Sequence, residues 1–138
     1  MTKKNIIIYS IISVCVVIAA LVIILVINAN KPKASGTINL YISGYNNEVI
    51  FCDDVEFYEG EYLLDVLKRY VEVEMGEGNL EGMMVGINDC FARDVYTVYF
   101  KLVVNCEYAL YGVGELALAD KDEVRITYSS IDDWSTGC

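Results

Sequence analysis

Five cysteines are the most reactive side chains in this sequence, and no histidine accompanies them. Cys15 lies inside a long apolar run, which leaves Cys52, Cys90, Cys106 and Cys138 with three complete pairings. A bond between Cys90 and Cys106 is disfavoured, because the extended strand between them spans about 30 Å and a disulfide needs Cα atoms within about 7 Å. The sequence leaves the disulfide state open, with free thiols favoured. A thiol protease or zinc site needs histidine or a tight ligand quartet, so neither is predicted.

Adjacent carboxylates form the second reactive group, at Asp53-Asp54, at Asp120-Lys121-Asp122-Glu123 and at Asp132-Asp133. Paired carboxylates can bind Ca²⁺ or act as the acid and base of a glycosidase. None of these clusters has the alternating ligands, central glycine and final glutamate of an EF-type loop. We therefore expect turns and solvated surface here, with no metal site and no catalytic residue. A small surface hydrolase using paired carboxylates is the third of three functional hypotheses.

Tyrosine is abundant, with 11 residues in 138, and it favours a binding surface. It combines a large contact area with a polar tip at low rotamer cost, although tyrosine also simply favours strands. The predicted contact surface lies on the longest strand and the segment after it: Tyr99, Phe100, Asn105, Tyr108 and Tyr111. Phe100 shares a face with the apolar strand residues, so a place in the core is the alternative for that ring.

The residues predicted to position this surface belong to the longest β-favouring run, 95–106. Tyr96, Val98, Phe100, Leu102 and Val104 alternate onto one face, while the other face is mixed. This pattern predicts the central strand of a sheet with one covered face.

The other elements predict an α+β domain. Leu63, Val66, Leu67 and Tyr70 repeat at helical spacing and predict one amphipathic helix. Alternating or short apolar segments predict further strands at 37–43, 83–87 and 124–128. The short pieces 48–52 and 55–58 predict one more strand, with a break by a turn or bulge at Asp53-Asp54 as the alternative. One helix packed on a mixed sheet is a β-grasp-like architecture.

Residues 6–27 form a 22-residue apolar run that would span about 33 Å as a helix, enough to cross a bilayer. We expect an uncleaved transmembrane signal-anchor, with a removed signal peptide as the alternative. The predicted organisation is a cytoplasmic 1–5, the membrane helix 6–27, a linker 28–36, an extracellular domain 37–129 and a flexible tail 130–138. The chain would then be a single-pass protein of the cell membrane.

The part of the chain from position 34 onward is strongly acidic. It contains 6 basic and 20 acidic side chains, a formal charge of −14. A phosphate backbone would be repelled by such a surface, so nucleic acid is not an expected partner.

Residues 59–67, Glu-Gly-Glu-Tyr-Leu-Leu-Asp-Val-Leu, resemble the "EG-x-T-LLDAL" helix entry of the bacterial DUF4430 family, a relative of the C-terminal β-domain of transcobalamin and intrinsic factor. Residues 100–105 are similar to its "W-x-x-Y-V-N-G" strand and turn, and Ala109, Gly112 and 116–124 to its "A…G…L-x-DGD-x-V". The resemblance covers roughly 36–129. Phe100 stands in place of the family's Trp, and Tyr62 in place of its Thr. Cys106 and Lys121 replace turn glycines, which predicts longer or differently shaped turns.

The resemblance implies an exported, cell-surface or membrane-anchored β-grasp domain of a bacterium, with an ill-defined function. The first hypothesis is a non-enzymatic, membrane-anchored extracellular module that binds a small ligand or a surface protein. In the eukaryotic relatives this domain closes over cobalamin held mainly by a separate helical barrel, which this sequence does not encode. An accessory subunit for uptake of cobalamin or another vitamin is therefore the second hypothesis, and it requires a partner protein. The expected partners are the membrane, through residues 6–27, and a cell-surface or vitamin-transport protein. No cofactor is expected apart from cobalamin, by resemblance only.

Overall fold

The computed structural model describes residues 2–30 and 33–138, so Met1 and the Lys31–Pro32 part of the predicted linker lie outside the described residues. The chain forms two compact units, Met1–Lys33 and Ala34–Cys138. The second unit thus starts three residues before the domain boundary expected at 37.

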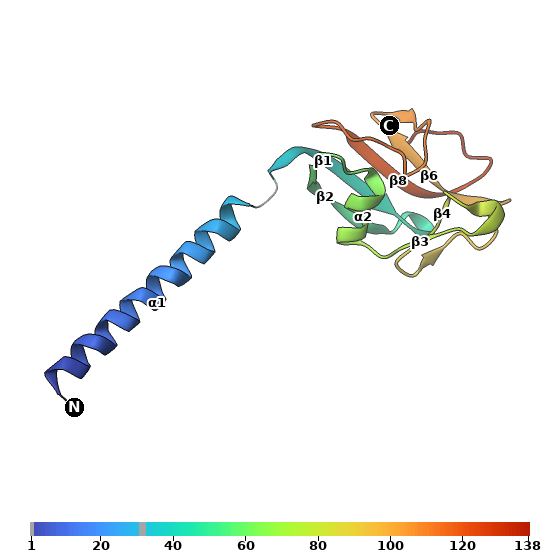
Figure 1. Ribbon diagram of the computed structural model, residues 1–138. Helices are drawn as coiled ribbons and strands as arrows, with labels where there is room; N and C mark the ends of the chain where they lie inside the picture. Colours follow the sequence, from blue (N-terminus) through green and yellow to red (C-terminus); the bar gives the residue numbers. More distant parts are fainter. Residues whose placement is uncertain (1, 31–32) are drawn as a thin grey trace. The chain divides into compact units, whose positions relative to one another are not determined.

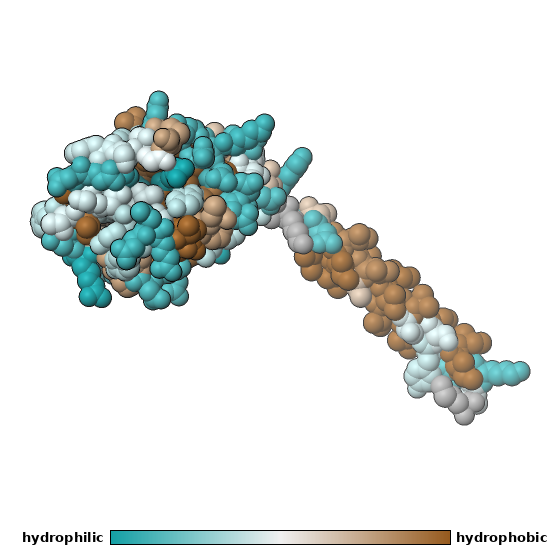
Figure 2. All heavy atoms as spheres, turned by 180° about the vertical axis from the view of Figure 1, so that it is seen from behind, coloured by the Kyte–Doolittle hydropathy of each residue, from teal (hydrophilic) through white to brown (hydrophobic). Residues whose placement is uncertain are grey.

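The first unit contains a single helix, α1 (Lys3–Ala29). Its 27 residues span about 40 Å at 1.5 Å per residue. Its length and composition would allow it to cross a membrane. Figure 2 shows hydrophobic colour along most of this helix, whereas the visible face of the second unit is largely hydrophilic. The apolar helix expected at 6–27 is therefore present.

The second unit is built on a five-stranded mixed sheet with the strand order β2-β1-β8-β6-β7 (Figure 1). Its strands are β1 (Ala34–Ser43), β2 (Val49–Tyr58), β6 (Val98–Val104), β7 (Glu107–Tyr108) and β8 (Glu123–Ser130). Strands β1 and β8 pair in parallel, and the other neighbours are antiparallel. The strand expected at 95–106 is not the central one: β8 is the middle strand of the sheet, and β6 lies between β8 and the edge strand β7.

One expectation about an individual strand is wrong, and another is confirmed. The strand predicted from Val95 begins only at Val98, because the amides of Thr97 and Val98 bond to the carbonyl of Asp94 in a turn. Tyr96 is consequently 84% exposed and does not share the apolar face. The pieces at 48–52 and 55–58 form the one predicted strand, β2, which is continuous through Asp53-Asp54.

Strand β2 lies at the edge of the sheet, and side chains form hydrogen bonds with some of its unpaired backbone groups. The Tyr58 amide donates to Glu61 Oε2 at 2.8 Å, and the Arg69 guanidinium bonds both the Glu56 carbonyl and the Glu61 carboxylate. Unpaired edge groups invite pairing with other chains. These contacts therefore protect the end of β2 from such pairing.

A second, three-stranded sheet and a short helix complete the unit. The sheet order is β3 (Val73–Met75), β4 (Met84–Ile87), β5 (Cys90–Phe91), and short 3₁₀ turns occur at Tyr45–Asn47 and Gly78–Leu80. Helix α2 (Leu63–Tyr70) confirms the predicted helix. It begins with a reciprocal pair in which the Tyr62 amide donates to Asp65 Oδ2 and the Asp65 amide donates to the Tyr62 carbonyl. The Asp65 carboxylate thus caps this helix although Tyr62 stands where the family has Thr.

The hydrophobic core lies between α2 and one face of the large sheet. Alternate residues of β1 and β8 point into it and are fully buried: Ile38, Leu40, Ile42, Val124 and Ile126. Leu63, Val66 and Leu67 of α2 are also fully buried. The observed architecture is therefore a mixed α+β unit with two sheets.

Cys106 and Lys121 stand where the family has turn glycines, and both keep the positive φ that glycine would adopt. The expectation of longer turns at these two positions is therefore wrong. Val104 pairs with Glu107, so only Asn105 and Cys106 form the β6–β7 turn, with φ of 51° and 65°. Lys121 likewise has a φ of 69°. A non-glycine residue in this left-handed region is strained.

Replacing Lys121 with glycine is therefore expected to raise the free energy of unfolding by about 1 kcal/mol. Urea unfolding of the detergent-solubilised full chain measures this change. Lys68→Gly is the matched control, because Lys68 is exposed in helix α2 and glycine there should cost about 1 kcal/mol. The same change would then have opposite signs at the two sites. A loss at both would contradict the strain assigned to Lys121.

Candidate functional site

Three of the five predicted contact residues meet at a hollow of about 150 Å³ beside β6. Tyr99, Phe100 and Tyr111 line it together with glycines and further apolar residues: Gly82, Met83, Met84, Leu102, Gly112 and Val113. Tyr111 is 60% exposed and Met83 41% exposed, so two of its walls are open to a partner. The hollow has the aromatic and methionine lining that adaptable binding sites use.

Phe100 and Tyr99 play different parts in this lining. Phe100 is 8% exposed and belongs to the hydrophobic core, so the core alternative for its ring is correct. Its ring meets Tyr128 edge to face at 5.8 Å between centroids. Burial, followed by the neighbouring Tyr108 and Asp133, raises the pKa of Tyr99. Tyr99 and Phe100 are neighbours on β6, so the Tyr99 side chain points to the opposite face of the sheet, toward Tyr108 and Asp133.

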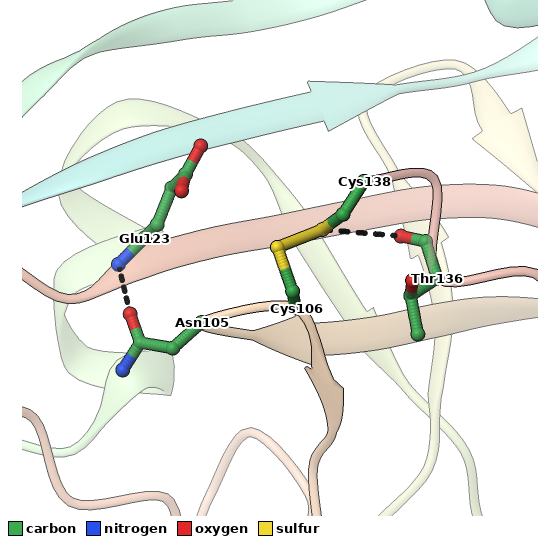
Figure 3. The surroundings of a disulfide bond; sticks show 5 residues. All are labelled: Asn105, Cys106, Glu123, Thr136 and Cys138. Carbon is green, nitrogen blue, oxygen red and sulfur yellow. Dashed lines mark hydrogen bonds between the residues drawn. A yellow bond between two sulfur atoms is a disulfide. The ribbon is translucent and has the colours of Figure 1, made fainter.

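Asn105 and Tyr108 do not line this hollow. The Asn105 side chain donates to Asp122 Oδ1 at 2.8 Å and accepts from the Glu123 amide at 2.9 Å, a contact visible in Figure 3. Its role in the structure is to hold the turn after β6. Tyr108 donates its hydroxyl to the Ser135 carbonyl at 3.2 Å. The five predicted residues therefore do not form one site.

Residues 131–138, which we call the strap, are attached to the sheet, and this differs from the flexible tail expected at 130–138. Cys106 and Cys138 form a disulfide, so the expectation of free thiols is wrong for this pair (Figure 3). Lys101 Nζ pairs with Asp133 Oδ2 at 3.0 Å and also donates to the Ser135 carbonyl. Lys101 is only 3% exposed, although the sequence placed it on the mixed strand face. No periodicity in the sequence indicates that the strap covers Lys101.

The other two cysteines of this unit, Cys52 and Cys90, are free. Cys90 does not pair with Cys106, as predicted. It is buried, and desolvation raises the pKa of its thiol, which makes it a poor nucleophile. Cys52 is exposed on β2.

The acidic clusters serve mainly in turns. Asp120 Oδ1 accepts from the Thr37 amide at 2.9 Å, and Asp122 Oδ2 accepts from the Ala119 amide at 2.9 Å. Within residues 2–30 and 33–138, no three His, Cys, Asp or Glu side chains are grouped to hold a metal ion. The Asp120 and Asp122 carboxylates thus have backbone partners within the fold.

A larger hollow of about 580 Å³ lies at the small sheet. Its lining is mixed, with Glu74, Glu77 and Arg93 beside apolar residues such as Leu80 and Phe91. No sequence signal marked it. Charged side chains of both signs line it, in contrast to the apolar and aromatic hollow at Tyr111.

The strap is expected to loosen in acid. Hydrogen bonds from Ser135, and then Lys101, lower the pKa of Asp133 from 3.8 to about 2. A lowered pKa stabilises the folded state fully above pH 3.8, and this contribution is lost as the pH falls toward about 2. Emission of Trp134, the single tryptophan, should therefore change between about pH 4 and 2. An Asp133→Asn variant should lack this transition, and identical profiles for variant and wild type would contradict the assignment.

Comparison with known proteins gives the relatives of this unit. The model of the DUF4430 family, a domain of unknown function, matches residues 60–130. Haptocorrin in complex with Cbi has a TM-score of 0.56 and 17% identity over 71% of this chain and 26% of that one. A "putative metal binding protein" from Ruminococcus gnavus ATCC 29149 has a TM-score of 0.52 and 18% identity over 70% of this chain and 98% of that one. At such identities the likeness concerns the fold alone, and no curated protein matches.

The chain thus spans about a quarter of the haptocorrin chain. The match to the family model covers just over half of the 138 residues, and it includes α2, β6 and β8. It also includes the segments in which the sequence resembled the family. The chain belongs to the DUF4430 family.

Proposed function

We propose that this protein is a non-enzymatic binding module, anchored in the cell membrane by α1, with its second unit outside the cell. The observation that carries the proposal is the open, apolar and aromatic hollow formed by Tyr99, Phe100, Tyr111 and two methionines. An accessible lining of this kind is unusual in a unit with a charge of −14. It fits an apolar group of a small ligand or of a cell-surface protein.

The construction of the hollow supports this use. Phe100 is fixed in the core and gives a rigid floor, whereas Tyr111 and Met83 form walls that extend into solvent. Methionine adapts to irregular apolar shapes, and tyrosine adds contact area with a polar tip. The hollow therefore combines a fixed base with adjustable sides.

The fold and the first helix support the remaining parts of the proposal. The parallel pair of β1 and β8, with α2 packed across the sheet, favours a β-grasp-like architecture. The length and apolar composition of α1 favour a membrane anchor. Protease added to intact cells should therefore remove the second unit and leave a protected fragment containing α1. Protection of the second unit would overturn the proposed orientation.

The hollow is tested with indole as the probe and the full chain in lipid nanodiscs. Saturation-transfer NMR should detect indole on the wild type above the level seen with empty nanodiscs. A Tyr111→Ala/Met83→Ala variant should bind indole about tenfold more weakly, because a wall and an aromatic contact are lost. Arg93→Ala, in the larger hollow, is the matched control and should bind as the wild type does. Equal loss in the control, or no loss in the double variant, would overturn the assignment.

An accessory role in uptake of cobalamin or another vitamin is the second candidate, and the likeness to haptocorrin solved with Cbi favours it. This chain matches only 26% of haptocorrin, so a partner protein would have to supply the rest of a corrinoid site. Absorbance titration with cobalamin should show binding only when a vitamin-transport partner is present. No binding with any such partner would remove this candidate.

A further inference from the structure

Three polar side chains are buried in the described part of the chain, and all three lie on one face of the large sheet: Ser43, Lys101 and Ser129. Thr127 of β8 pairs with both Ser43 and Lys101, and Ser129 pairs with Tyr99. This face points away from the hydrophobic core. We call Ser43, Tyr99, Lys101, Thr127 and Ser129 the polar face. Lys101 shares this face with four side chains that carry a hydroxyl group, and a buried ammonium is costly unless an anionic acceptor reaches it.

The strap supplies that acceptor. Asp133 Oδ2 lies 3.0 Å from Lys101 Nζ, and the Ser135 carbonyl accepts a second hydrogen bond from the same ammonium. Asp133 Oδ1 is held in place by the Ser135 amide at 3.0 Å and by its hydroxyl at 2.7 Å. The strap therefore presents a carboxylate and a carbonyl to the polar face, as an acidic peptide would.

Apart from the disulfide, the strap is held by the Lys101 contacts and by a few hydrogen bonds, one of them from the Ile131 amide to the Thr97 carbonyl at 2.9 Å. Its residues make no strand pairing, and most of its side chains are exposed. Tyr108 adds one hydrogen bond to the Ser135 carbonyl. The disulfide joins Cys138 to the turn residue Cys106 (Figure 3). Both cysteines are exposed to solvent. A reductant can therefore reach the bond while the core stays intact.

We propose that the strap is a redox-released cover, and that the polar face beneath it binds a carboxylate of an acidic peptide. Asp133 is the built-in occupant of this site. Tyr99 belongs to this face and also borders the hollow at Tyr111, but the proposal does not depend on the function proposed for that hollow. Lys101 is buried on this face, and Arg125 of β8, two positions before Thr127, adds a second cation whose buried Nε has no hydrogen-bond partner among the described residues. Two cations on one face favour a carboxylate over a cationic partner.

The release requires a dithiol reductant of the thiol–disulfide oxidoreductase class. One of its thiolates attacks a sulfur of the Cys106–Cys138 bond, forming a mixed disulfide and releasing the other cysteine as a thiolate that takes up a proton. The second thiol of the reductant then closes its own disulfide and releases the remaining cysteine. Two electrons pass to the protein, and two free thiols result.

Release of the strap is tested by the reactivity of Lys101. Lysines of the full chain are acylated with an N-hydroxysuccinimide ester, and the products are measured by mass spectrometry. In the oxidised protein Lys101 should react at least about tenfold more slowly than the exposed Lys68. Reduction with dithiothreitol should raise the rate at Lys101 about tenfold, and a Cys106→Ser/Cys138→Ser variant should show the raised rate without reductant. Cys52→Ser is the matched control and should respond as the wild type does. If Lys101 stays protected after reduction and in the double variant, the strap is a fixed part of the fold and the proposal fails.

Binding is tested with a fluorescent peptide that has the sequence of residues 131–138 with serine in the last place. The receptor is the full chain with Asp133→Asn and Cys138→Ser, whose own strap lacks both the carboxylate and the bond. The peptide should bind at least about tenfold more tightly than the same peptide carrying asparagine for its third residue. The oxidised wild type should bind neither peptide, because the tethered strap has a high effective concentration. Equal binding of both peptides, or binding of neither by the variant, would overturn the carboxylate site.

Discussion

Replacing Leu67 with alanine is expected to lower the free energy of unfolding by about 3 kcal/mol. Leu67 is fully buried between α2 and the large sheet, in the same cluster as Leu63 and Ile126. Alanine would lose the transfer free energy of the side chain and leave a cavity. Helix α2 has only eight residues, too few to be stable by itself, so its position depends on this packing.

Urea unfolding of the detergent-solubilised chain measures this loss, followed by near-ultraviolet circular dichroism of the aromatic residues. Far-ultraviolet circular dichroism would be dominated by α1, because α1 has 27 residues and α2 has only eight. Leu64→Ala is the matched control, because Leu64 is a neighbour on the same helix that is only partly buried. It should cost about 1 kcal/mol or less. Equal losses at both positions would mean that α2 does not dock on the sheet through Leu67.

The hydrophobic core was predictable because its signals are local and periodic. Leu63, Val66 and Leu67 repeat at the helical period and mark the buried face of α2. Strand alternation likewise identified the inward residues of β1 and β8. The same alternation could not show that Lys101 is buried, because its cover comes from a segment more than 30 positions away.

The candidate site was only partly predictable, because residues from distant segments of the sequence form it. Tyr99 and Tyr111 were named from residue type, yet Met83 and Met84 reach the same hollow from β4 and the residue before it. No sequence spacing links those segments. Asn105 was named as a contact residue, but its side-chain hydrogen bonds to Asp122 and Glu123 make it part of a turn. A polar residue in a turn has the same sequence signal whether it binds a ligand or its own backbone.

The turn at Asn105 and Cys106 shows how long-range contacts override the conformational preference of the local sequence. Cys106 has a φ of 65°, which cysteine tolerates poorly, and it is the residue that bonds to Cys138. The Asn105 amide also donates to the Glu123 carbonyl at 2.9 Å. Together these contacts hold a two-residue turn that the local sequence disfavours.

Removing the disulfide with Cys106→Ser/Cys138→Ser is expected to lower the free energy of unfolding by about 3–4 kcal/mol. The bond joins residues separated by 32 positions, and the enclosed loop contains all of β8, the middle strand. Without the bond, the unfolded chain gains the conformational freedom of that loop. Serine has a Cβ like cysteine, so the cost of the positive φ at position 106 is unchanged.

Urea unfolding with and without dithiothreitol separates the bond from the side chains. The reductant should lower the stability of the wild type by the same amount and leave the double variant unchanged. Cys52→Ser, at an exposed free thiol, should change stability by less than about 0.5 kcal/mol. A Cys106→Gly/Cys138→Ser variant should recover about 1 kcal/mol, because glycine adopts the positive φ without strain. If dithiothreitol has no effect on the wild type, the disulfide does not constrain the unfolded chain, and the stability of β8 must come from its strand pairing alone.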